Sequence, residues 1–271
     1  MDLTGLIDPH VHAAPDIRPR LLDDIDLSAQ AAAAGMRGVL LKSHTGTTAE
    51  RATIASRLVP GLRVWGGLVL NHAVGGFNPA AVEVAAASGA REIWMPTLDA
   101  ANHVRVHHQD RPGLALDDPS SAPALGEILS MIAQHDLILG TGHLSAAEIV
   151  SLVPRARQAG VRKILITHPE APMTRLPYAV QRELAAVGCR FERVWVYTTP
   201  ALGRLLSPRD VIEGIRQVGF ESTVLATDMG QAGNPTPVEG MQAFVDACLE
   251  AGFDERQVRR MGSETIAEWL S

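Results

Sequence analysis

Short runs of aliphatic and β-branched residues alternate with longer Ala-rich or amphipathic stretches along the whole chain. The short runs are typical of buried parallel strands, and the longer stretches are typical of helices that cover a sheet. Strands are expected at residues 6–12, 38–44, 64–72, 92–97, 137–143, 163–168, 191–197 and 223–228. Helices are expected at residues 27–34, 49–58, 79–87, 124–133, 146–158, 178–186, 207–218 and 237–251.

These strand and helix pairs recur at nearly constant spacing. The expected strand ends lie about 25 to 32 residues apart, with one exception, as in consecutive βα units. Several helices end at a glycine, such as Gly35, Gly61 and Gly89, as a helix C-terminus before a strand requires. No linker or break in composition divides the chain. We therefore predict an α/β protein, a single-domain (β/α)8 TIM barrel over residues 1–271.

The exception in the spacing is the segment at residues 98–122, which follows the fourth expected strand. It contains His103, His107, His108 and two prolines, but little helical period. Segments that follow the strands of such a barrel lie at the mouth of the active site. We therefore expect a long loop here that covers the site.

Composition and charge narrow the class of protein. Hydrophobic residues make up 46% and charged residues 20% of the chain, which is enough apolar material for a buried core. The formal net charge is -6 without a basic block, so nucleic acid and anionic membranes are not expected partners. Cys189 and Cys248 stand far apart in apolar segments, and no export signal or membrane-spanning run is visible. We expect a cytoplasmic protein.

Histidines mark the ends of the expected strands. Five of the eight expected strands end on a histidine: His12, His44, His72, His143 and His168. The carboxyl ends of the strands of a barrel converge on one pocket, so these side chains should become neighbours in space. Convergent imidazoles indicate a metal site.

A local motif on the first strand sharpens this prediction. His10 and His12 are two residues apart, so they point to the same face of the strand and can bind one ion. Asp228 closes the eighth strand, and His143 and His168 close the fifth and sixth. The chain thus resembles the amidohydrolase superfamily, whose motif is H-x-H on strand 1, single histidines on strands 5 and 6, and an aspartate on strand 8.

The resemblance extends over nearly the whole chain, because residues 257–267 are similar to the closing helix of compact members. It implies one or two divalent ions, zinc or another metal such as manganese or iron. His10 and His12 would hold the first ion, and His143 and His168 the second if there is one. Asp228 would bind metal and take the proton of the attacking water.

The chain departs from the family on strand 4, where members often carry a lysine carbamate or a glutamate that bridges two metals. Here that strand reads Ile93-Trp94-Met95-Pro96-Thr97, and no bridging group is visible. Lys42 and His44 share a face of the second strand. Lys42 is therefore a candidate metal ligand as a carbamate, or an ammonium that faces the substrate. His44 is a candidate metal ligand, partner of a ligand, or donor to the substrate.

Other polar residues have an ordinary structural interpretation at least as strong as a functional one. His72 is expected to line the pocket, and the three histidines of residues 98–122 are expected to be solvated. Glu192, Tyr197, Glu170 and Arg175 could reach a substrate or form surface ion pairs.

The expected activity is metal-dependent hydrolysis of an amide, cyclic amide, lactone or related bond. A metal lowers the pKa of a bound water towards about 7 and so supplies hydroxide at neutral pH. Asp228 would carry the proton, while His44 or Lys42 would stabilise the oxyanion. Two alternatives stay open: a metal-dependent decarboxylase or hydratase, and a non-catalytic barrel that binds metal or ligand. We further expect a small-molecule substrate and a homo-oligomer.

Overall fold

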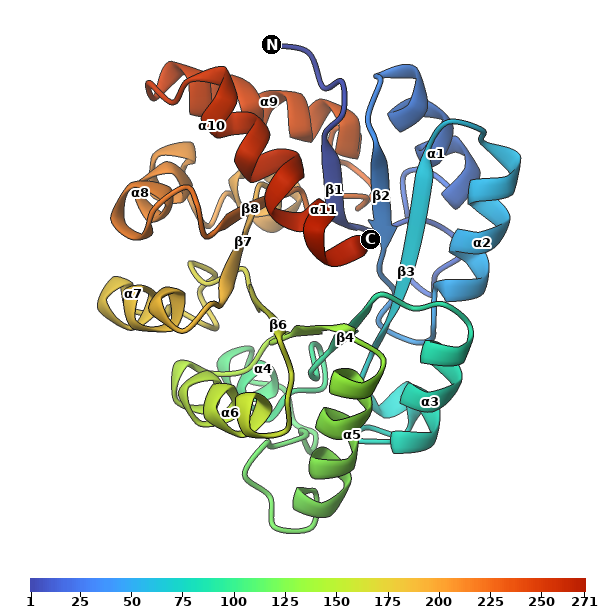
Figure 1. Cartoon of the computed structure of the whole chain (residues 1–271), viewed down its shortest axis with the longest axis vertical. Helices are drawn as coiled ribbons and strands as arrows, with labels where there is room; N and C mark the ends of the chain where they lie inside the picture. Colours follow the sequence, from blue (N-terminus) through green and yellow to red (C-terminus); the bar gives the residue numbers. More distant parts are fainter.

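The computed structural model describes all residues, 1–271. Eight parallel strands follow one another around a barrel in the order β1 to β8, and helices surround them (Figure 1). The strands are β1 Ile7–Val11, β2 Gly38–Leu41, β3 Arg63–Val69, β4 Glu92–Trp94, β5 Ile138–Gly140, β6 Lys163–Thr167, β7 Arg190–Val194 and β8 Thr223–Ala226. This arrangement confirms the predicted (β/α)8 barrel.

Helices connect consecutive strands, as predicted. They are α1 Asp24–Ala33, α2 Ala49–Leu58, α3 Pro79–Ala87, α4 Ala101–Val106, α5 Ala122–Gln134, α6 Ala146–Gln158, α7 Tyr178–Ala186, α8 Pro208–Val218 and α9 Pro237–Glu250. The C-terminal residues form α10 Glu255–Arg259, a short π-helix η4 Arg260–Glu264 and α11 Thr265–Leu270. Short 3₁₀ helices lie at η1 His72–Val74, η2 Val196–Thr198 and η3 Pro200–Leu202. Several begin with a capping box, such as Ser145 with Glu148 on α6, which satisfies the free N–H groups of the first turn. None of the helices has both the length and the apolar character needed to cross a bilayer.

The barrel closes between β1 and β8 through backbone hydrogen bonds. Asp228 N donates to His10 O at 2.8 Å, and His12 N donates to Met229 O at 2.8 Å. Gly230 makes this closure possible, because a Cβ at that position would overlap the carbonyl oxygen of His12. The ends of β1 and β8 are therefore held side by side, and with them the residues of the H-x-H motif and Asp228.

The barrel interior is apolar at one end and polar at the other. Ile7, Leu40, Trp94 and Leu165 form a buried cluster with Ile266 and Leu270 of the C-terminal segment. Helix α11 lies across this end of the barrel in Figure 1. The opposite end carries the histidines.

Two details differ from the sequence prediction. The strands are shorter than expected, so most candidate residues lie just beyond them, where the backbone no longer forms hydrogen bonds with a neighbouring strand. Two of these residues, His168 and Asp228, have positive φ angles of 31° and 54°. Residues 98–122 are not a loop throughout, since they include helix α4, Ala101–Val106. This helix is only six residues long and lacks a side-chain cap, so its sequence carries little helical signal.

Candidate metal centre

Seven of the ten histidines form a continuous cluster at the carboxyl ends of the strands. Neighbouring rings in this cluster have centroids between 4.2 and 6.5 Å apart. The members are His10, His12, His44, His103, His107, His143 and His168. The strand ends thus bring together residues that are up to 158 positions apart in the sequence (168 − 10).

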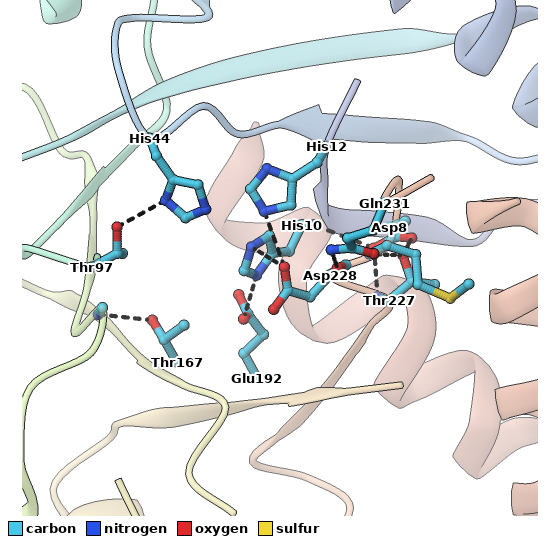
Figure 2. A network of polar contacts seen from close by, with 12 residues as sticks. Asp8, His10, His12, His44, Thr97, Thr167, Glu192, Thr227, Asp228 and Gln231 are labelled. Atoms are coloured by element: carbon cyan, nitrogen blue, oxygen red, sulfur yellow. Dashed lines mark hydrogen bonds and ion pairs between the residues drawn. The ribbon is translucent and has the colours of Figure 1, made fainter. Parts of the chain in front are cut away.

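The centre of the cluster is formed by β1 and β8. One ligating atom each from His10, His12 and Asp228 lie within 4.8 Å of one another. His10 Nε2 and His12 Nε2 lie 3.0 and 3.1 Å from the same oxygen, Asp228 Oδ1 (Figure 2). Two imidazoles and a carboxylate that converge in this way are a donor set suited to zinc or another divalent transition metal.

Glu192 on β7 holds the His10 ring from behind. Its Oε1 accepts a hydrogen bond from His10 Nδ1 at 2.7 Å, and both side chains are fully buried (Figure 2). The proton on Nδ1 leaves Nε2 to face Asp228, where it has no aligned hydrogen-bond partner. Metal-binding histidines commonly have such a carboxylate partner, which fixes the orientation of the ring. The alternative of a surface ion pair, which the sequence left open for Glu192, is therefore wrong.

Burial and the neighbouring charges shift the pKa values of His10, His12 and Asp228 in different directions. Burial alone would lower the pKa of His10, but the carboxylates of Asp228 and Glu192 raise it to about 9. Burial lowers the pKa of His12 to about 3. Burial would raise the pKa of Asp228, yet His10 and His12 hold it well below its ordinary value. Asp228 is therefore ionised at neutral pH.

Arg20 contacts the outer nitrogen of His12. Its Nη2 donates to His12 Nδ1 at 3.3 Å, while its Nε donates to Asp16 Oδ2 at 2.9 Å. In this arrangement the proton of a neutral His12 lies on Nε2, which faces Asp228. Metal binding through Nε2 would require the other tautomer, in which Arg20 would give up the contact with Nδ1 and keep its pairing with Asp16. Nothing in the sequence near Arg20 signalled this contact.

The ends of β5 and β6 bring His143 and His168 together. Their ring centroids are 4.9 Å apart, and both side chains are buried. Both ring nitrogens of His168 are buried without a hydrogen-bond partner. Buried polar atoms are rarely left unpaired, so these nitrogens, like Nε2 of His10, fit a bound cation. His143 Nδ1 lies 2.8 Å from His103 Nδ1 on α4.

Lys42 and His44 follow β2 and border the same centre. Lys42 is 1% exposed, and its Nζ lies 5.0 Å from the Trp94 ring centroid. Burial lowers its pKa, which the carboxylates of Asp228 and Glu192 oppose. His44 stacks on His12 with centroids 4.9 Å apart. His44 Nδ1 lies 2.9 Å from Thr97 Oγ1 (Figure 2).

An acidic residue does lie on β4, at the first position of the strand expected at residues 92–97. Glu92, the first residue of the strand, is fully buried, and neither of its oxygens has a hydrogen-bond partner. Its pKa is raised well above the ordinary value by burial and by the Glu192 carboxylate. The sequence pattern does not single out Glu92, because an acidic residue that opens a strand usually faces solvent.

A cavity of about 570 Å³ opens onto the cluster. Its polar wall includes Asp228, Lys42 and two arginines, Arg18 and Arg20. The remaining wall is mostly apolar: Pro19, Leu98, Pro172, Met173, Ala201, Leu202, Leu205 and Ala232. The volume and mixed lining suit a small organic molecule.

Several predicted residues lie elsewhere or play other parts. His72 and His108 lie outside this cavity, whereas His103, His107 and Tyr197 line it. The expectation that all three histidines of residues 98–122 are solvated is therefore wrong for His103, which is 7% exposed. Glu170 pairs with the fully buried Arg193 rather than facing the cavity.

Comparison with solved structures shows the same fold in several enzymes. An amidohydrolase from Pseudomonas aeruginosa matches with a TM-score of 0.66 and 13% identity, over 98% of this chain and 95% of that one. A lactonase from Listeria monocytogenes matches with a TM-score of 0.68 and 12% identity, over 100% and 95%. A probable dipeptidase from Pseudomonas aeruginosa matches with a TM-score of 0.68 and 10% identity, over 98% and 94%. At this level of identity, the similarity is one of fold.

Comparison at the level of sequence gives a family but no curated relative. No curated protein matches the chain significantly. The sequence profile of a family of unknown function, DUF6282, matches residues 5–192. That region is more than half of the chain and includes His10, His12, His143, His168 and Glu192. The chain therefore belongs to the DUF6282 family and folds as the amidohydrolases do.

Proposed function

We propose that this protein is a metal-dependent hydrolase that cleaves an amide, cyclic amide, lactone or related bond of a small molecule. The observation that carries the proposal is the convergence of His10, His12 and Asp228 within 4.8 Å, with Glu192 behind His10. We propose zinc, because imidazole and carboxylate ligands suit it. The bound ion would lower the pKa of a water molecule and polarise a carbonyl group.

Asp228 is proposed to move the proton. It is ionised at neutral pH, and its side chain is 13% exposed, so it borders the cavity. A carboxylate in this position can accept a proton from the attacking water and deliver it to the leaving nitrogen or oxygen.

His44 is proposed to donate a hydrogen bond to the oxyanion. Asn71 Nδ2 donates to Thr97 Oγ1 at 2.8 Å, so the hydroxyl hydrogen of Thr97 is free to point at His44 Nδ1. His44 then carries its own proton on Nε2, on the opposite side of the ring. Burial lowers the pKa of His44 well below its ordinary value, which keeps the ring neutral. A neutral donor of this kind stabilises a tetrahedral intermediate.

The substrate is proposed to carry an anionic group. Arg18, Arg20 and Lys42 line the cavity, whereas Asp228 is its single acidic residue. Arg20 is already paired with Asp16, but Arg18 takes part in no ion pair. Arg18 is thus the cation best placed to bind a carboxylate or similar group, with the apolar wall around Met173 and Leu202 to hold the rest.

Metal analysis combined with a substrate screen tests this function. The purified protein should bind a divalent metal and hydrolyse amides or lactones, with N-acyl amino acids cleaved faster than their uncharged methyl amides. Arg18→Gln should reduce this preference for the anion. Release of carbon dioxide without hydrolysis would indicate a decarboxylase instead, and bound metal without any turnover would indicate a binding protein.

A further inference from the structure

Helix α4 fastens the segment between β4 and α5 to the end of β5. Asn102 Nδ2 donates to the backbone oxygens of His143, at 3.0 Å, and Met173, at 2.9 Å. One residue further along, His103 Nδ1 lies 2.8 Å from His143 Nδ1. Asn102 and His103 are 4% and 7% exposed, so both contacts are shielded from water. The helix therefore holds both the backbone and the side chain of His143.

The contact between the two imidazoles restricts where protons lie. Two ring nitrogens at 2.8 Å need a single proton between them, so one ring donates and the other accepts. If His143 donates its Nδ1–H, its Nε2 carries a free lone pair. If His103 donates, Nε2 of a neutral His143 must carry the proton and has no lone pair for a metal.

The same device is present on the other side of the centre. His10 donates its Nδ1–H to Glu192 at 2.7 Å, which directs Nε2 at Asp228, 3.0 Å away. In the pair of His143 and His103 the acceptor is an imidazole instead of a carboxylate. Such partners fix ring orientation and tautomer, and their loss typically weakens metal binding or activity about 10–100-fold.

We propose that His103 is a positioning residue, which accepts the Nδ1–H of His143 and so presents Nε2 of His143 to the metal centre. Asn102 supports this role by clamping the His143 carbonyl oxygen. The use of the free Nε2 rests on the proposed metal-dependent function, but the tautomer is a property of the metal-free protein. Helix α4 then has a defined part in the centre, beyond that of a cover over it.

The geometry favours this role over direct metal binding by His103. The Nδ1 of His103 is already directed at His143, and its ring packs on His107 with centroids 4.2 Å apart.

Nitrogen-15 NMR of the metal-free, full-length protein tests the proposal directly. Long-range proton–nitrogen correlations distinguish the two neutral tautomers, and the signals of His143 are assigned by their loss in His143→Gln. The Nδ1–H tautomer is expected at His143. The Nε2–H tautomer at His143 would overturn the proposal, whether or not the protein hydrolyses anything.

Three variants separate positioning from general packing. His103→Leu removes the acceptor and should weaken cobalt binding about 10–100-fold, with a changed visible spectrum of the cobalt-loaded protein. His103→Asn places an oxygen near the former Nδ1 and should restore affinity and the Nδ1–H tautomer. His108→Asn is the matched control on the same segment and should behave as the wild type. Unchanged tautomer and cobalt affinity in His103→Leu, or no rescue by His103→Asn, would overturn the proposal.

Discussion

The two sides of the candidate metal centre differ in how their imidazoles are paired. On the side of β1 and β8, His10 and His12 lie against the carboxylate of Asp228, and Glu192 binds His10 from behind. On the side of β5 and β6, His143 contacts another imidazole, and His168 has no hydrogen-bond partner. Carboxylates thus accompany the first pair of histidines and are missing from the second.

This difference appears in the pKa of His10, although not in that of His12, which burial lowers to about 3. Despite burial, the carboxylates raise the pKa of His10 to about 9, whereas burial lowers the pKa of His168 to about 4. A site that attracts a proton this strongly also attracts a divalent cation. We infer that nearby negative charge, rather than the number of histidines, decides where a first ion would bind.

The largest expected effect compares one histidine from each side. His12→Ala should remove nearly all tightly bound metal, because it takes one ligating atom from the cluster of His10, His12 and Asp228. His168→Ala should retain at least one ion, because that cluster stays intact. Elemental analysis after gel filtration measures both, with circular dichroism as the control for folding. Full metal occupancy in His12→Ala, or equal losses in both variants, would break the comparison.

The second prediction separates metal binding from proton transfer at Asp228. Asp228→Asn keeps the shape and one oxygen donor but cannot accept a proton at neutral pH. Turnover should fall about 10²–10⁴-fold, the usual contribution of a general base. Metal content should fall much less. The measurement is kcat per bound metal ion, and a near-normal value would rule out the proton-transfer role.

The sequence predicted the part of this centre that lies in local motifs. His10 and His12 are two residues apart on one strand, and His143, His168 and Asp228 close strands whose spacing predicted the barrel. The barrel geometry alone therefore brought distant strand ends to one place. The role of each as a ligand stays a prediction.

The partners of these residues could not be predicted in the same way. The contact of His10 with Glu192 spans 182 positions, and that of His143 with His103 spans 40. Such pairs depend on side-chain direction and on how the barrel closes, which no local pattern records. Helix α4 was missed for a related reason, since tertiary contacts such as those of Asn102 hold it rather than its own propensity.

The third prediction uses the raised pKa of His10. Below about pH 9 the metal-free His10 carries an extra proton, which an ion must displace, so metal affinity should rise as the pH rises towards 9. At pH 7 binding should release about one proton from His10, while His168 is already neutral and releases none. By the same shift, His10 stabilises the metal-free fold below pH 6.5 and loses this contribution as the pH rises through about 9.

Calorimetry in buffers of different ionisation enthalpy counts these protons. Glu192→Gln is the matched variant, because it keeps a hydrogen-bond acceptor for His10 but removes the charge. It should release fewer protons at the same pH. If the wild type released no protons on metal binding at pH 7, the carboxylates would not raise the pKa of His10. The difference in pKa between His10 and His168 would then be absent.

The smallest expected effect concerns Lys42, which lies between the two sides. Its Nζ lies over the Trp94 ring, and burial lowers its pKa, but the Asp228 and Glu192 carboxylates and the ring face favour the ammonium form. We therefore expect Lys42 to stay unmodified and to contact the anionic part of the substrate. Lys42→Met should raise KM about tenfold, the equivalent of one charge-assisted hydrogen bond, with little change in kcat.

Lys42→Arg distinguishes this role from a carbamate that bridges two metals. A guanidinium keeps the positive charge, so it should preserve much of the substrate affinity that Lys42→Met loses. It cannot react with carbon dioxide, so a bridging carbamate would be lost equally in both variants, together with a second ion. The measurements are KM and metal content for the two variants, with thermal unfolding as the control because Lys42 is buried. A carbamate signal from the metal-loaded wild type in labelled bicarbonate, combined with loss of an ion in Lys42→Arg, would show that Lys42 joins the two sides as a ligand.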